Sequence, residues 1–378
     1  MRPLDVLPMR GGGRATTLLR RACGVALLAT LLSSCAGHAP ALRETSPAIL
    51  LPVGQATLTD GRGRFREVFC AVRYDHGAAL PHDRPCEDSS ALWKLPGEPP
   101  PSGRPVALGR APVPTRVVMV PGLLAECAAE LSKAFEDATA NLQAQGYATG
   151  YIQTRGRQGS VTNADIIHAA VMAMPQDERI ILVTHSKGTV DTLEALVKHP
   201  DLPARVAAVI SVAGAVNGSP LADSFPEFLA HLAEETHLSS CPPGVDLEAV
   251  DSLRRSVRLG WLATHPLPRT VRTYSLAAFA AAPDMSWGLR PFYRDLAGTE
   301  PVNDGLVIAS DAIIPGSTLL GYPNADHMAV AMPFGANAPL LAATLMDHND
   351  YPRAVLLEAA VRYVQEDLAA RPMIAENR

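Results

Sequence analysis

Short apolar runs rich in Val and Ile alternate with helical patterns from Thr115 onward, and this alternation constrains the fold more than any other feature of the sequence. The runs fall at 116–120, 148–152, 179–184, 205–212 and 270–276. Helical patterns lie between the first four of them, at about 124–144, 162–174 and 187–199. Buried strands that alternate with helices are typical of a parallel sheet covered on both faces. The sequence therefore predicts an α/β fold with a mostly parallel sheet, and a last helix at about 352–368.

One long interval interrupts this alternation before the last of the five runs. It contains two amphipathic stretches, 224–238 and 247–262, which are joined through Cys241-Pro-Pro-Gly244. An insertion of this length between two core strands is a typical place for a cap over a binding pocket. We therefore expect a helical cap at about 219–265.

The stretch before the alternating region carries a different pattern. Polar and apolar residues alternate at 55–59 and again at 66–73, on either side of Asp60-Gly61. Alternation with a period of two is a strand signal, and Asp-Gly is a frequent turn between paired strands. We expect a β-hairpin here.

Seven prolines stand from Pro96 to Pro114, and they indicate an extended linker that takes no part in a core. The chain then divides into a leader at 1–34, a segment at 35–110 and a main domain at 111–378. The middle segment would hold a tether, the hairpin and this linker.

The leader has the layout of an export signal. Four arginines precede an apolar run at 24–32, which is too short to cross a bilayer as a helix. The run ends in Leu32-Ser-Ser-Cys35, which resembles the cleavage box of bacterial lipoproteins. That resemblance implies that Cys35 becomes a lipid-bearing N-terminus, and that Ala36 directs the protein to the outer membrane. The alternative is an ordinary signal peptide with an incidental Cys; in either case we expect an exported protein of the cell envelope.

Charge and cysteine content describe what remains after the leader. Its loss removes five arginines and one aspartate, so the formal charge falls from −5 to −9. An acidic chain without a basic stripe is a poor ligand for nucleic acid. An even number of cysteines in an exported protein suggests disulfides. Three pairings are possible and either pair could stay reduced; we favour Cys70 with Cys86, and Cys127 with Cys241.

The strongest local motif is Thr184-His-Ser186-Lys-Gly188, where an apolar run leads directly into an amphipathic helix. A sharp strand-to-helix turn raises a serine hydroxyl clear of the sheet edge, and it needs small residues two before and two after the serine. Gly188 meets that demand, whereas Thr184 is larger than the usual glycine. We predict that Ser186 is a nucleophile, against the alternative of a structural Ser-Lys-Gly turn.

The stretch 185–191 resembles the nucleophile turn and helix of the α/β-hydrolase superfamily, with a closer likeness to bacterial lipases and esterases. Ala213-Gly-Ala-Val-Asn-Gly-Ser-Pro-Leu-Ala-Asp223 is similar to a Gly-Ser-x-x-Ala-Asp stretch of those lipases, and the likeness covers roughly 115–370. The resemblance implies that the backbone amides of Lys187 and Leu123 hold the oxyanion. Taken alone, the Pro-Gly before Leu123 is more often a plain turn.

The resemblance also implies that a catalytic acid and then a histidine follow the serine. His327 lies just after a last apolar run at 317–322, where the base of this fold is expected, and His348 is the runner-up. We interpret His327 as the base that takes the serine proton.

The acid is predicted from Val302-Asn-Asp304-Gly-Leu-Val, which closely matches the acid loop of bacterial lipases. Asp304 would orient the imidazole of His327, although Asp-Gly is also a common turn pair. Asp326 is adjacent to His327 in the chain and badly placed to reach its ring, and Asp311 is a weaker substitute.

Together these features predict a serine hydrolase that cleaves a small lipophilic ester through an acyl-enzyme on Ser186. A thioesterase or amidase acting on lipidated envelope material is one alternative, and a catalytically silent binding protein on the same scaffold is another. We expect no cofactor and no metal, because the chain has no His-Glu-x-x-His, no Cys-x-x-Cys and no phosphate loop. The calcium site of similar lipases is not expected, since no Asp follows His327 at 328–331.

Overall fold

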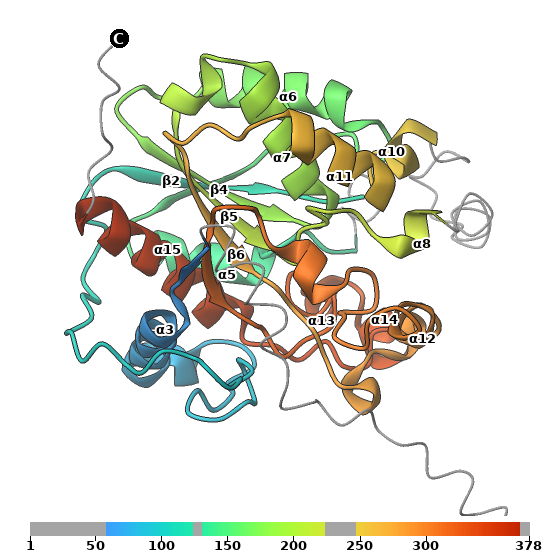
Figure 1. Ribbon diagram of the computed structural model, residues 1–378. Helices are drawn as coiled ribbons and strands as arrows, with labels where there is room; N and C mark the ends of the chain where they lie inside the picture. The colour runs from blue at the N-terminus through green and yellow to red at the C-terminus, as the bar shows by residue number, and fades with distance from the viewer. Residues whose placement is uncertain (1–57, 124–130, 224–246, 371–378) are drawn as a thin grey trace, which may run out of the picture. The chain divides into compact units, whose positions relative to one another are not determined.

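A seven-stranded sheet runs through the computed structural model, which describes residues 58–123, 131–223 and 247–370 (Figure 1). The strand order is β1-β7-β6-β5-β4-β2-β3, and every neighbouring pair is parallel. The strands are β1 (Thr59–Asp60), β2 (Thr115–Val120), β3 (Ala148–Tyr151), β4 (Arg179–His185), β5 (Val206–Val212), β6 (Arg272–Leu276) and β7 (Thr318–Gly321). The predicted parallel α/β sheet is confirmed.

Helices cover the two faces of the sheet (Figure 1). One face carries α6 (Ser160–Met172) and α7 (Lys187–Lys198), and the other carries α3 (Arg62–His76), α5 (Glu136–Ala144) and α15 (Arg353–Ala370). Shorter helices are α8 (Pro220–Asp223), α10 (Leu247–Asp251), α11 (Arg255–Thr264), α12 (Arg290–Ala297), α13 (Phe334–Asn337) and α14 (Pro339–Ala343). Turns of 3₁₀ helix lie at Gly77–Ala79, Leu202–Ala204, Ala282–Asp284, Trp287–Leu289 and Ala309–Ala312.

The central strands β2, β4 and β5 are mostly apolar because both of their faces are buried. On β2, Val117 and Met119 pack into the cluster that contains α3 and α15, whereas Val118 and Val120 pack into the cluster that contains α6 and α7. This division follows from the alternation of side chains along a strand. The described residues all belong to one compact unit.

The predicted hairpin before the main domain is wrong, because its second half is the helix α3. Phe65, Val68, Phe69 and Val72 recur every three or four residues and are almost completely buried. That spacing places them on one helical face, where Phe65 meets the ring of Tyr363 of α15 at 6.3 Å. Of the first half, residues 55–57 lie outside the described residues, and Thr59 begins the two-residue strand β1, which pairs with β7.

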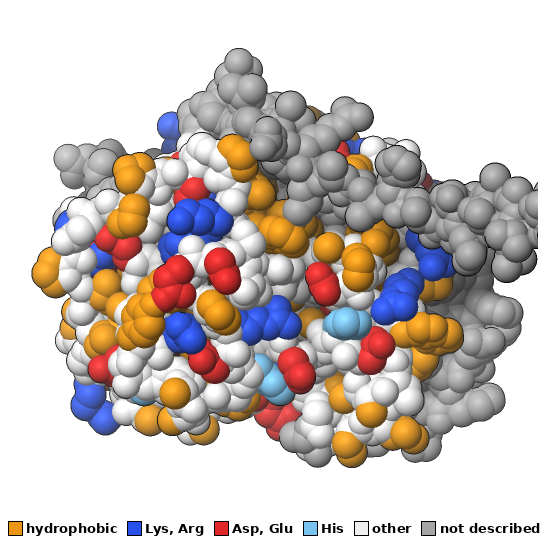
Figure 2. Space-filling model, turned by 90° about the horizontal axis from the view of Figure 1, so that it is seen from below, with side chains coloured by type: hydrophobic (Ala, Val, Ile, Leu, Met, Phe, Trp, Pro, Cys, Tyr) orange, Lys and Arg blue, Asp and Glu red, His pale blue; other side chains and the backbone are white. Residues whose placement is uncertain are grey.

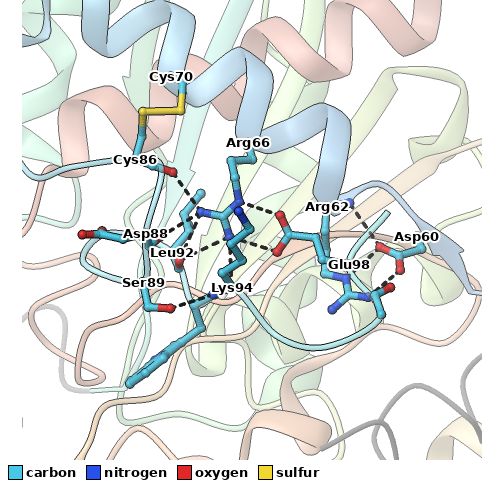
Figure 3. A network of polar contacts seen from close by, with 12 residues as sticks. Asp60, Arg62, Arg66, Cys70, Cys86, Asp88, Ser89, Leu92, Lys94 and Glu98 are labelled. Atoms are coloured by element: carbon cyan, nitrogen blue, oxygen red, sulfur yellow. Dashed lines mark hydrogen bonds and ion pairs between the residues drawn. A yellow bond between two sulfur atoms is a disulfide. The ribbon is translucent and has the colours of Figure 1, made fainter. Parts of the chain in front are cut away.

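A disulfide and one arginine hold the irregular segment after α3 in place (Figure 3). Cys70 of α3 is bonded to Cys86, as predicted. Arg66, one turn earlier, donates hydrogen bonds to the carbonyls of Cys86 and Trp93 at 3.0 and 3.1 Å, and it pairs with Glu98 at 2.5 Å. Because one guanidinium meets several carbonyls of the segment, its course is fixed without regular secondary structure.

The proline-rich stretch forms no helix or strand between Pro96 and Pro114, yet it is attached to the main domain. Arg362 of α15 donates to the carbonyls of Ala107, Leu108 and Gly109 at 2.9, 3.0 and 2.9 Å. The stretch therefore runs as a strap along α15. Its carbonyls are the acceptors that the buried guanidinium of Arg362 needs.

About half of the predicted cap, residues 224–246, lies outside the described residues, as do Cys127, Cys241 and the leader with Cys35. The predicted amphipathic stretch at 247–262 is divided between α10 and α11. Arg258 of α11 is buried and donates to the carbonyl of Val216 at 3.1 Å, which attaches the insertion to the loop after β5.

In the described part of the chain, no helix combines the length and apolarity that a bilayer span requires. On the face seen in Figure 2, basic and acidic side chains are interspersed, without a large area of one sign.

Candidate active site

Ser186 occupies a strained turn between β4, which ends at His185, and α7, which begins at Lys187. Its φ of 55° and ψ of −128° lie in a region that residues with a side chain rarely adopt. Two glycines make room for this turn. A Cβ on Gly188 would lie 2.4 Å from the carbonyl oxygen of Val120, and one on Gly122 would lie 2.7 Å from the Cβ of Ser186. Only hydrogen fits at either position.

Thr184 stands where the resemblance leads one to expect glycine, and the structure accommodates its side chain. The hydroxyl of Thr184 lies 2.7 Å from the hydroxyl of Thr189, which in turn lies 3.1 Å from that of Ser211. All three side chains are buried, so the chain of hydroxyls satisfies polar atoms that would otherwise be costly beneath the turn.

His327 and Asp304 form a direct acid–base pair. Nδ1 of His327 lies 2.7 Å from Oδ2 of Asp304, and both residues are 1% exposed. The other carboxylate oxygen accepts the backbone N–H groups of Leu306 and Val307 at 2.9 and 2.7 Å. The carboxylate is thus held on both oxygens, so it fixes the Nδ1–H tautomer of His327 and leaves the lone pair on Nε2.

The loop that carries Asp304 is itself tightly held. Asn303 is fully buried, and its Oδ1 accepts the N–H of Gly305 at 3.0 Å. Gly305 has a φ of 95°, and a Cβ there would lie 2.9 Å from the sulfur of Met285. The glycine of the predicted Asn-Asp-Gly motif is therefore required by both backbone conformation and packing.

His185 connects the nucleophile strand to His327. Its ring centroid lies 4.7 Å from that of His327, and its Nε2 lies 3.0 Å from the backbone carbonyl of His327. Burial, and then the neighbouring His327, lower the pKa of His185 to about 3. His185 therefore stays neutral and donates this hydrogen bond, while Ser186 follows it in the chain. The pair of His327 and Asp304 thus lies beside His185, the residue that precedes Ser186 at the carboxyl end of β4.

Asp326 is a residue of the site whose role sequence reasoning missed. Its carboxylate accepts the backbone N–H groups of Met328 and Ala329 at 3.0 and 2.8 Å, and that of Ser286 at 3.0 Å. Burial raises the pKa of Asp326. Its carboxylate clamps the turn on which His327 stands, whereas the carboxylate that meets the imidazole belongs to Asp304. An Asp at the start of a short turn is the signal that points to such a clamp.

A buried ion pair lies behind the turn at Ser186. The ammonium of Lys187 is 2.7 Å from Oδ1 of Asp191, and Oδ2 of Asp191 accepts from Asn163 at 2.8 Å. Burial raises the pKa of Asp191. The side chain of Lys187 is engaged in this interior network, so what it offers to the site is its backbone amide. That amide opens α7, where the first N–H groups have no acceptor within the helix.

His348 and Asp311, the competing residues, have other contacts, and so has His265, another histidine that follows Ser186. His265 stacks on Trp261 with the ring centroids 4.8 Å apart, and the half-buried His348 donates its backbone N–H to Ser286 at 3.4 Å. Asp311 pairs with Arg255 at 2.9 Å. In the described part of the chain, the carboxylate that contacts the imidazole of His327 is therefore that of Asp304 and not that of Asp311.

Comparison with known proteins gives one strong match. No protein-family model matches the chain, and no curated protein matches it. The metagenomic carboxyl esterase MGS0156 is 57% identical, with a TM-score of 0.80, over 86% of this chain and 98% of its own. The Bacillus licheniformis lipase BlEst2 in its mature form is 23% identical, with a TM-score of 0.46, over 64% of this chain and 93% of its own.

The match to the metagenomic enzyme extends beyond the region of the sequence resemblance. Residues 115–370 number 256 of 378, so a match over 86% of the chain also takes in part of the N-terminal segment. At this identity, and with nearly the whole relative covered, the chain belongs to the α/β-hydrolase superfamily, in the family of that carboxyl esterase.

Proposed function

We propose that this carboxyl esterase hydrolyses small lipophilic esters through an acyl-enzyme on Ser186. His327 acts as general base and acid, Asp304 orients it, and the amides of Leu123 and Lys187 hold the oxyanion. The observation that carries the proposal is the buried pair of Asp304 and His327. His185 is hydrogen-bonded to the carbonyl of His327 and directly precedes Ser186 in its strained turn.

The proposed reaction has two halves. Nε2 of His327 takes the proton of the Ser186 hydroxyl while Oγ bonds to the ester carbonyl carbon, and the carbonyl oxygen becomes an oxyanion. The intermediate collapses, the alkoxy group leaves with the proton from His327, and the acyl group stays on Ser186. Water then gives a proton to His327 and attacks the acyl carbon, and collapse returns that proton to Ser186 and releases the acid.

The close approach of two backbone segments at Ser186 supports this place for the oxyanion. Gly122 contacts Ser186, and Leu123 follows it at the end of β2. Lys187 begins α7 on the other side of the serine. Amides placed in this way act on charge that develops in the transition state, and removal of one such donor costs on the order of 10²–10³ in rate.

Apolar packing beside the oxyanion loop supports a lipophilic substrate. Leu123 packs against Ala222 of α8 and Val250 of α10, together with Leu253. Both helices belong to the insertion that the sequence predicts to be a cap. An apolar wall at this place favours esters whose acyl or alcohol part is hydrocarbon.

The nucleophile is tested with a fluorophosphonate probe and a series of nitrophenyl esters from acetate to palmitate. Wild-type protein is expected to be labelled and to hydrolyse the esters, and Ser186→Ala is expected to abolish both. Ser256→Ala, at an exposed serine of α11, is the matched control and is expected to behave as wild type. Labelling that persists in Ser186→Ala would overturn the assignment.

The lipid anchor is proposed from the leader alone. Export and lipidation of Cys35 rest on the arginines, the apolar run and the Leu-Ser-Ser-Cys box, and attachment in the outer membrane rests on Ala36. Metabolic labelling with a palmitate analogue in a bacterial host is expected to mark the wild type and Cys23→Ser, but not Cys35→Ser. Equal labelling of all three proteins would contradict the anchor.

A further inference from the structure

Two histidines and two aspartates meet where α6 runs beside the end of α7. His168 and Asp165 belong to α6, while His199 and Asp201 follow α7. Nε2 of His168 lies 3.0 Å from each carboxylate oxygen of Asp201, and Nε2 of His199 lies 2.9 Å from Oδ1 of Asp165. The two imidazole rings are stacked, with their centroids 4.1 Å apart and 9° between their planes. The mechanism uses none of these side chains.

Three of them are arranged as ligands of one metal ion. One donor atom from each of His168, His199 and Asp201 lies within 4.8 Å of the other two. Zinc bonds to nitrogen and oxygen of about 2.1 Å in a tetrahedron separate the ligand atoms by about 3.4 Å. Shifts on the order of 1 Å bring the ligand atoms to this spacing, and one imidazole must also turn out of the stacked arrangement so that both ring lone pairs face the ion. The three side chains are 26%, 20% and 57% exposed, so they have room to make these shifts.

In the contact between His168 and Asp201, a hydrogen-bond proton occupies the place that a metal ion would take between the same two atoms. Their N···O distance is 3.0 Å, and replacing the shared proton by zinc opens it to about 3.4 Å. The contact of His199 with Asp165 keeps a proton on Nε2 and leaves Nδ1 as a lone-pair donor. A carboxylate on the second ring nitrogen is the usual outer partner of a metal-bound histidine.

The charges around the rings also suit a divalent cation. Asp165 pairs with Lys198 at 2.7 Å, so that ammonium is already balanced. With neutral imidazoles, the two carboxylates and this ammonium carry a net formal charge of −1. Two stacked imidazoles repel one another when both are protonated, and a divalent cation bound to neutral rings avoids this repulsion.

We propose that His168, His199 and Asp201 bind a zinc ion, with Asp165 as the outer partner of His199 and a water molecule as the fourth ligand. The ion joins α6 to the chain just after α7. Because α7 has 12 residues and a rise of about 1.5 Å per residue, it separates this site from Ser186 by about 18 Å. The ion is therefore a structural staple at the far end of the helix that begins at the nucleophile. Sequence motifs did not reveal it, since His168 and Asp201 are 33 residues apart.

Zinc titration of the full chain tests the site. Protein without a histidine tag is stripped with a chelator, titrated calorimetrically with zinc and assayed for bound metal after gel filtration. One zinc per chain is expected. Loss of an outer partner weakens metal binding by about 10–100-fold, so Asp165→Asn is expected to fall in that range. His168→Asn and His199→Asn remove direct ligands and are expected to weaken binding at least about 100-fold.

A control and a second readout separate a metal site from two plain ion pairs. His265→Asn, at a histidine that stacks on Trp261, is expected to bind zinc as the wild type does. Zinc is expected to raise the melting temperature of the wild type and of this control, but not that of His168→Asn. Absence of stoichiometric zinc binding, or binding and thermal stabilisation that survive in both His168→Asn and His199→Asn, would overturn the proposal. Neither readout depends on ester hydrolysis.

Discussion

At the scale of single residues, the site depends on backbone atoms that approach one another more closely than any side chain would allow. Ser186 holds a strained conformation between Gly122 and Gly188, whose hydrogens face Ser186 and the carbonyl of Val120. Strain of this kind persists where the surrounding structure determines it completely. In this protein it presents the hydroxyl of Ser186 next to the amides proposed to receive the oxyanion.

Gly122→Ala tests this close approach. The added methyl group would lie 2.7 Å from Cβ of Ser186, so either the turn or the oxyanion loop must shift. We expect kcat/KM for a nitrophenyl ester to fall on the order of 10²–10³-fold, as for loss of one oxyanion donor. Gly150→Ala is the control, because a Cβ there meets nothing within 4 Å. Equal activity of the two variants would contradict the account.

Asp304→Asn tests the acid. The substitution keeps the shape of the side chain, but it loses the charge and lets His327 adopt the other tautomer. A fall in kcat on the order of 10⁴-fold is expected from a triad of this kind. Asp311→Asn, which breaks a pair with Arg255, is expected to have little effect on kcat. If the effects of the two substitutions were reversed, the acid would have to be reassigned.

At the scale of elements, the strands could be predicted from sequence and the N-terminal helix could not. The run 116–120 became β2 at Thr115–Val120 because a strand buried on both faces needs an uninterrupted apolar run. The stretch 66–73 fits both a period of two and a period of three to four. Packing of Phe65 against Tyr363 of α15 favours the helix. The residues around 66–73 do not reveal this contact, because Tyr363 is far away in the sequence.

The helix α3 is joined to α15 by a titratable contact. Nε2 of His76 lies 2.7 Å from the buried carboxylate of Glu358, which also accepts from Asn141 and Arg362, and Nδ1 of His76 lies 2.9 Å from Asp75. Burial alone would lower the pKa of His76, but the hydrogen bonds to Asp75 and Glu358 raise it above its ordinary value of 6.5.

This contact makes the docking of α3 depend on pH. Because the pKa of His76 is raised in the folded state, its stabilising contribution is fully present below the unfolded pKa and is lost as pH rises through the folded pKa. His76→Gln is therefore expected to lower the free energy of unfolding more at pH 5.5 than at pH 8.5, as measured by urea unfolding.

His82→Asn is the control for this pH dependence. Burial, and then the positive charge of Arg353, lower the pKa of His82, so its pH trend has the opposite sign. A loss of stability in His76→Gln that is the same at both pH values would contradict the role of the imidazolium.

At the scale of the whole molecule, segments far apart in sequence bury one another's apolar side chains and supply one another's hydrogen-bond partners. The residues before Thr115 close one face of the sheet through α3, and the strap along α15 satisfies Arg362. Sequence reasoning could single out Ser186, Asp304 and His327 as candidates, because each stands in a local motif of a known order. It missed the roles of Asp326 and of Asp191 with Asn163, since their importance comes from partners brought together by folding.

The disulfide contributes to the stability of this closed arrangement. Cys70 and Cys86 are 16 residues apart, and a bond that closes a loop of this size is worth about 3 kcal/mol through the entropy of the unfolded chain. The double variant Cys70→Ser, Cys86→Ser is expected to lose about that much unfolding free energy. Its kcat for nitrophenyl esters is expected to be retained, because the bond joins α3 to the segment after it. A loss of activity without a loss of stability would contradict this division.

The central claim is that Ser186, His327 and Asp304 act together on one carbonyl. A crystal structure of the protein inactivated by an alkyl phosphonate tests it most directly. The account predicts that phosphorus is bonded to Oγ of Ser186 and that the phosphonyl oxygen accepts from the amides of Leu123 and Lys187. Nε2 of His327 should lie within hydrogen-bond distance of Oγ or of a second phosphonate oxygen. A phosphonate attached to another residue, or one whose oxygen meets neither amide while His327 lies far from Oγ, would contradict it.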